Sequence, residues 1–89
     1  MADDEETLLE FPCEFPIKII GKAECDLDVL VFRIVSPHVP DLGEGAIRNR
    51  LSREGNYQSV TVTIQATSKA QLDDIYHALS ARDEIIMVL

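Results

Sequence analysis

The sequence predicts an α+β fold of the ferredoxin-like type, a βαββαβ sandwich in a single domain. Strand-like and helix-like patterns follow one another in that order along 89 residues, a length that suits one domain. The two predicted helices carry matching apolar stripes, so the chain reads as two similar halves. Two half-buried helices cover one face of a sheet, and right-handed crossovers then bring the first and third strands to its centre. We therefore expect a four-stranded antiparallel sheet in the order 4-1-3-2 with both helices on one face.

The clearest strand pattern runs from 59 to 66, where polar and apolar residues alternate without a break. Successive side chains of a strand point to opposite faces. β-branched residues occupy five of these eight positions and favour the extended chain. We expect this strand in the middle of the sheet, with these residues facing the core: Val60, Val62, Ile64 and Ala66.

Three further segments have strand patterns. The first runs from 15 to 21 and ends at a glycine. The second, 46–51, presents alternating arginines, which suit an edge strand because charge discourages the addition of another strand. Residues 52–56 form the hairpin connection, with Gly55-Asn56 as turn residues. The last strand, 84–89, is apolar on both sides.

Two segments repeat apolar residues at the i, i+3, i+4 and i+7 spacing of an amphipathic helix. The first helix is expected from Glu24 to about Ser36, where Pro37 ends it. The second begins after Ser68, which forms a capping box with Gln71, and ends near residue 81. A loop rich in proline and glycine, 36–45, separates the two halves. The two stripes are Leu27, Leu30, Val31 and Ile34, then Leu72, Ile75, Tyr76 and Leu79.

The charge balance is acidic. Sixteen acidic residues against eight basic ones give a net charge of -8, and Asp3, Asp4, Glu5 and Glu6 stand together near the start. We predict that residues 1–7 are a disordered acidic leader and that 8–89 form the single domain. A negative surface repels phosphate backbones and anionic membranes, so neither nucleic acid nor a membrane is an expected partner.

The N-terminal region carries acids where a signal peptide needs bases, and the apolar runs are too short for a membrane helix. Cys13 and Cys25 do not form a CxxC pair. Two such cysteines are most simply free thiols in a reducing compartment. The sequence therefore predicts a cytoplasmic location.

Three stretches of the chain resemble the YbeD-like family of small bacterial proteins. They are Leu8-Leu9-Glu10-Phe11-Pro12, Gly55-Asn56-Tyr57-x-Ser59-Val60 and Met87-Val88-Leu89. The resemblance covers nearly the whole chain after residue 7. It implies the βαββαβ fold and a likeness to ACT-type regulatory domains, which bind small effectors and pair through their sheets. It implies no catalytic residues, suggests a connection with lipoate metabolism, and would place an effector around Gly21 and Lys22.

Other functions that this fold hosts need residues that the chain lacks. Metal chaperones need paired thiolates in the loop after the first strand, where Cys25 stands alone. A phosphate hydrolase of the acylphosphatase type needs an arginine in that loop, where Lys22 stands instead. His38 and His77 have no third metal ligand at a recognisable spacing. RNA-binding members need aromatic residues on the open sheet face, where we expect Lys18, Ile20, Thr61, Thr63 and Gln65. We therefore expect no catalytic residue, metal or cofactor.

The uncovered sheet face is the strongest functional clue. Ile20, Ile86 and Val88 are expected to project there together, and an exposed apolar patch often marks an interface. Alternatively, Leu8, Leu9 and Phe11 of the same chain cover this patch.

A basic cluster, Arg48 and Arg50 with Arg53, either protects the edge strand or binds an anion or an acidic partner. Two functions stay open. One is a small non-catalytic, ACT-like module that binds a small effector. The other is a protein–protein interaction subunit that uses the open face, in a homodimer or with another protein, and takes no small ligand.

Overall fold

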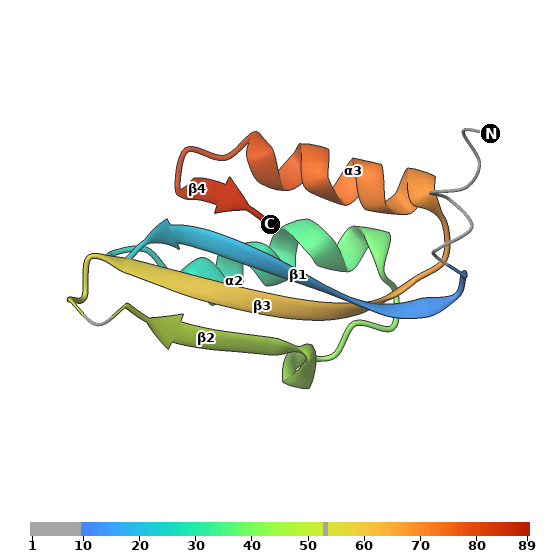
Figure 1. Cartoon of the computed structure of the whole chain (residues 1–89), viewed down its shortest axis with the longest axis horizontal. Helices are drawn as coiled ribbons and strands as arrows, with labels where there is room; N and C mark the ends of the chain where they lie inside the picture. Colours follow the sequence, from blue (N-terminus) through green and yellow to red (C-terminus); the bar gives the residue numbers. More distant parts are fainter. Residues whose placement is uncertain (1–9, 53) are drawn as a thin grey trace.

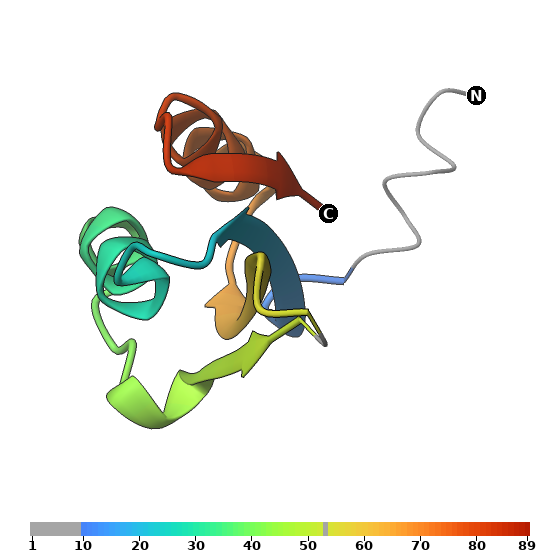
Figure 2. The same ribbon diagram turned by 90° about the vertical axis from the view of Figure 1, so that its left-hand side faces the viewer.

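The structure, a computed structural model, describes residues 10–52 and 54–89 (Figure 1). Its strands form one antiparallel sheet in the order β2-β3-β1-β4, which is the predicted order read from the other edge. Both helices lie on one side of the sheet (Figure 2). The predicted ferredoxin-like architecture is confirmed, and the predicted leader 1–7 lies outside the described residues. The elements are β1 Cys13–Lys22, α2 Leu27–Val35, short 3₁₀ turns Ser36–His38 and Glu44–Ala46, β2 Ile47–Leu51, β3 Tyr57–Ala66, α3 Lys69–Ser80 and β4 Ile85–Val88.

The core lies between the helices and one sheet face. The four residues of β3 predicted to face the core are all buried there, and β3 is an inner strand as expected. Full burial of such an apolar side chain stabilises the fold by roughly 1.5–3 kcal/mol. The other buried apolar residues are Ile17, Ile19, Leu27, Val31, Val35, Val39, Leu72, Ile75, Leu79 and Ile85.

The first helix begins at Leu27, not at Glu24 as the sequence predicted. The residues before it form a turn, because the Cys25 amide and thiol both donate to the Lys22 carbonyl, at 3.4 and 3.1 Å. Asp26 stands at the N-cap without a side-chain capping bond. The buried stripe also differs from the predicted one: it is Leu27, Val31 and Val35, while Leu30 and Ile34 are half-buried.

The cap of α3 is confirmed, with one difference. The Ser68 Oγ accepts a hydrogen bond from the Gln71 amide at 3.0 Å. The Gln71 Oε1 accepts from the Thr67 amide at 2.7 Å, one residue earlier than a capping box predicts. The Gln71 Nε2 also donates to the His38 carbonyl at 2.8 Å. One side chain therefore caps the helix and ties the 36–45 loop to it.

The last strand contains a β-bulge that reverses part of the prediction. Val88 lies opposite Ile19 and Met87 opposite Ile20, but Ile85 lies opposite Gly21, which leaves Ile86 as the extra residue. Residues directly opposite each other share a face. Val88 therefore lies on the helix side against the core, and its predicted placement on the open face is wrong.

Candidate functional site

The sheet face turned away from the helices, here called the open face, carries basic side chains from two strands. The strand register places Arg48 of β2 and Lys18 of β1 on either side of Thr61 of β3. Arg50 lies opposite Ser59 in the next row. All three basic residues are exposed. Arg48, Arg50 and Lys18 form a cluster that we call the cationic patch.

The cationic patch surrounds a shallow depression of about 560 Å³, which Ser59 and Thr61 also line. The ion pairs of the described residues, Lys69–Asp73 and Arg82–Glu84, lie elsewhere and do not involve the patch. Like charges gathered on one surface repel each other and attract anions. In a chain of net charge -8 this face therefore has the opposite character to the molecule as a whole.

An apolar corner adjoins the cationic patch. Met87 lies opposite Ile20, and Leu89 exchanges both backbone hydrogen bonds with Lys18, at 3.3 and 2.7 Å. We call Ile20, Met87 and Leu89 the apolar corner; the last two are 49% and 57% exposed. Met87 and Leu89 thus lie beside Ile20, where the sequence predicted Val88. Ile86, also predicted there, is the exposed extra residue of the bulge. The open face also carries one aromatic that we did not expect, Tyr57, because β3 begins two residues earlier than predicted.

The turn after β1, predicted as an effector site at Gly21 and Lys22, is filled by the chain itself. Gln58 is 5% exposed and lies opposite Gly21. Its Nε2 donates to the carbonyls of Lys22 and Cys25, at 2.7 and 2.6 Å. Its Oε1 accepts from the Asn49 Nδ2 at 2.8 Å. The amide therefore satisfies two backbone carbonyls of this turn from within the chain.

Gly21 itself has no free space beside it. A Cβ at this position would come within 2.8 Å of the Leu27 Cδ2 and 2.9 Å of the Glu84 carbonyl oxygen. The glycine is there for close packing, and the effector prediction at this turn stays untested. Our sequence reading missed Gln58, although the alternation of β3 carried back from Val60 puts this polar residue on the core side.

Comparison with known proteins identifies the family. Residues 6–89 match a family model described as "Protein of unknown function (DUF493)". The chain belongs to the DUF493 family. The predicted YbeD-like resemblance is confirmed, because that family and DUF493 are the same.

Relatives within the DUF493 family cover the chain almost completely. A UPF0250 protein of Nitrosomonas europaea is 46% identical over 85 residues, covering 96% of this chain and 98% of its own. A UPF0250 protein of Chromobacterium violaceum is 40% identical over 89 residues, covering all of both chains. The solution structure of protein HP0495 from H. pylori matches with a TM-score of 0.72, covering 100% of this chain and 93% of that one. Its sequence identity of 12% supports the shared fold and nothing further.

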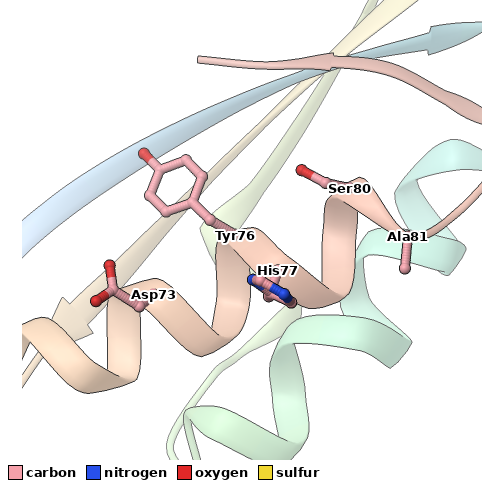
Figure 3. A pocket seen from close by; sticks show the side chains of 5 residues that line it. All are labelled: Asp73, Tyr76, His77, Ser80 and Ala81. Carbon is pink, nitrogen blue, oxygen red and sulfur yellow. The ribbon is translucent and has the colours of Figure 1, made fainter.

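The outer surface of α3 carries residue types that serve as nucleophile and base in enzymes. Asp73, His77 and Ser80 lie there, around a shallow depression of about 830 Å³ (Figure 3). A nucleophile and its base need a hydrogen bond of about 2.6–3.2 Å. No hydrogen bond of the described residues joins these three, and Asp73 instead pairs with Lys69 at 3.3 Å. In Figure 3 the three side chains project separately from the outer surface of the helix. The described side chains of this surface therefore form no nucleophile–base hydrogen bond.

The thiols and histidines show no metal cluster in the part of the chain that the structure describes. Cys13 and Cys25 are free and half-buried. Burial raises the pKa of the Cys25 thiol, and the negative charge of Glu84 raises it further. The two described helices are both too short to cross a membrane.

Proposed function

We propose that this protein is a non-catalytic binding module that holds a protein partner on its open face. The observation that carries the proposal is the pairing of the cationic patch with the apolar corner on the sheet face that the helices leave uncovered. Opposite charges steer a partner and set its orientation, while desolvated apolar contacts supply affinity. The partner that fits carries acidic side chains next to apolar ones.

An ACT-like module that binds a small effector, with a link to lipoate metabolism, is the alternative proposal. It rests on the family resemblance. The filled turn at Gly21, where the Gln58 amide occupies the backbone carbonyls, favours partner binding over effector binding. The proposal includes the cytoplasmic location predicted from the two free thiols.

Site-specific photo-crosslinking in cells tests the open face. A benzoylphenylalanine side chain at Ser59 probes this face, and the same group at Asp74, on the exposed side of α3, is the matched control. We expect a discrete protein adduct from position 59 and none from 74. The purified adduct partner should bind the wild-type chain with an affinity that falls as salt rises.

Charge reversal completes that test. Arg48→Glu with Arg50→Glu should abolish the adduct, whereas Arg33→Glu with Lys69→Glu makes the same change of charge elsewhere and should leave it. Equal adducts from both probe positions, or none from 59, would exclude the open face as the binding surface. NMR titration with amino acids and acyl cofactors tests the alternative, since shifts confined to the surroundings of Gly21 would favour an effector site.

A further inference from the structure

The charges of the cationic patch are close enough for one polyanionic segment to meet all of them. Lys18 and Arg48 flank Thr61 on neighbouring strands, which places their backbones about 10 Å apart. Arg50 follows Arg48 on the same face of β2, about 7 Å further on. These spacings are within the screening length of about 10 Å at 0.1 M salt. Several carboxylates in a row would therefore relieve the mutual repulsion of the patch.

The floor of the patch also suits carboxylates. Ser59 and Thr61, whose side chains carry hydroxyls, line the depression and lie beside the basic residues on the strand register. A hydroxyl or guanidinium donor bound to an ionised carboxylate makes a short, charge-assisted hydrogen bond. Glu14, far along β1 from the patch and opposite Gln65, is the acidic residue that the described strands place on this face. Apart from Glu14, the side chains that the described strands place on this face therefore supply no carboxylate for these donors.

The same chain contains a run of four carboxylates within reach of the patch. Residues 3–6 precede Cys13 by seven to ten positions, which is about 23–33 Å of extended chain. Along β1, Lys18 and Ile20, which is level with Arg50, follow Cys13 by five and seven positions, or about 17–23 Å. Phe11 is half-buried against the core and fixes the chain near the start of β1. A segment running back over β1 is thus long enough for residues 3–6 to reach the patch.

We propose that residues 3–6 bind the cationic patch of their own chain and compete there with the acidic partner. The competition rests on the proposed function, because the partner and residues 3–6 would bind the same face. The contact between residues 3–6 and the patch is tested separately, on the isolated chain. Deleting residues 1–7 should tighten the binding of the purified partner by about 2–10-fold, the factor that a mostly occupied site imposes on apparent affinity.

Paramagnetic broadening in NMR spectra tests the contact. The chain carries Ala2→Cys with a nitroxide label, and Cys13→Ser and Cys25→Ser remove the natural thiols. We expect the amide signals of Ser59 and Thr61 to lose most of their intensity, while those at the exposed end of α3 keep theirs. The loss should disappear in ~1 M NaCl, where the screening length is ~3 Å.

Three variants make the result specific, two of them a matched pair. Changing the four acids of residues 3–6 to Asn or Gln should restore the signals of Ser59 and Thr61. Arg48→Glu with Arg50→Glu should also restore them, whereas Arg33→Glu with Lys69→Glu should not.

Three outcomes would overturn the proposal. They are no broadening, broadening that survives the amide substitutions, and broadening that grows with protein concentration, which would indicate a second copy as the occupant. If the labelled leader fails to broaden the face but the photo-crosslink from Ser59 persists, the leader contact is wrong and the proposed function stands. If the crosslink from Ser59 is lost but the broadening remains, the proposed function is wrong and the leader contact stands.

Discussion

Replacing Gln58 by leucine tests how the structure holds the turn between β1 and α2. The side chain is 5% exposed, and its amide makes hydrogen bonds of 2.6–2.8 Å to Lys22, Cys25 and Asn49. Leucine keeps the approximate volume and removes every polar atom. Each hydrogen bond is worth about 0.5–1.5 kcal/mol net, and a buried polar group left without a partner costs about 1–3 kcal/mol. We expect Gln58→Leu to lower the free energy of unfolding by about 2–4 kcal/mol.

That loss is large for a chain of this size, whose total stability should be about 4–13 kcal/mol. In thermal unfolding it corresponds to a fall in the midpoint of at least ~8 °C, at about 4–8 °C per kcal/mol. Gln65→Leu is the matched control, because Gln65 lies on the same strand with an exposed side chain. Its midpoint should change little, since surface substitutions usually stay within about 0.5 kcal/mol.

A local measurement separates the turn from general loss of stability. Hydrogen exchange of the amides in 23–27 should accelerate in Gln58→Leu more than that of the β3 amides, because the turn loses its direct partner. Equal melting midpoints for Gln58→Leu and Gln65→Leu would refute the reasoning. The buried amide would then be a tolerated polar group, and its hydrogen bonds would add nothing measurable to the fold.

The same structure predicts the outcomes of three other experiments. Gly21→Ala should lower the free energy of unfolding in urea by about 1–3 kcal/mol, because its Cβ would lie under 3 Å from Leu27 and from backbone. The control Gly43→Ala would have no atom within 4 Å of its Cβ, and equal urea midpoints for the two variants would contradict this packing. Val88→Asp should lower the melting midpoint far more than Met87→Asp, since only the first puts a charge against the core, and the reverse order would show that the β4 register is wrong. Alkylation of Cys25, followed by mass spectrometry across pH, should reach half its maximal rate above the pH found for a thiol in an unstructured peptide, because burial raises its pKa; a midpoint at or below the peptide value would count against it.

Much of the fold was predictable because its signals are local and periodic. Unbroken alternation identified the inward face of β3, and alternating arginines identified β2 as an edge. Ser68 and Gln71 marked the start of α3 through a cap that spans three residues. Each signal depends on neighbours along the chain, so the sequence contains all the information needed.

Part of the candidate site was predictable for the same reason. Arg48 and Arg50 share a face in any regular strand, and Lys18 was expected on the same open face. Their arrangement around Thr61 depends on how three strands are aligned, and alignment is set by contacts between distant residues. The patch could be suspected from the sequence, but its geometry could not.

The remaining features were decided by tertiary structure. One unpaired residue in β4 reverses the faces of the residues after it, so Met87 rather than Val88 lies beside Ile20 on the open face. A glutamine 36 positions away closes the turn at Lys22, where sequence reasoning expected a ligand. Periodicity specifies which side chains share a face within one element, by itself. The neighbouring strand decides how the residues after a bulge face and which side chain fills a turn. Only the folded chain brings that strand into place.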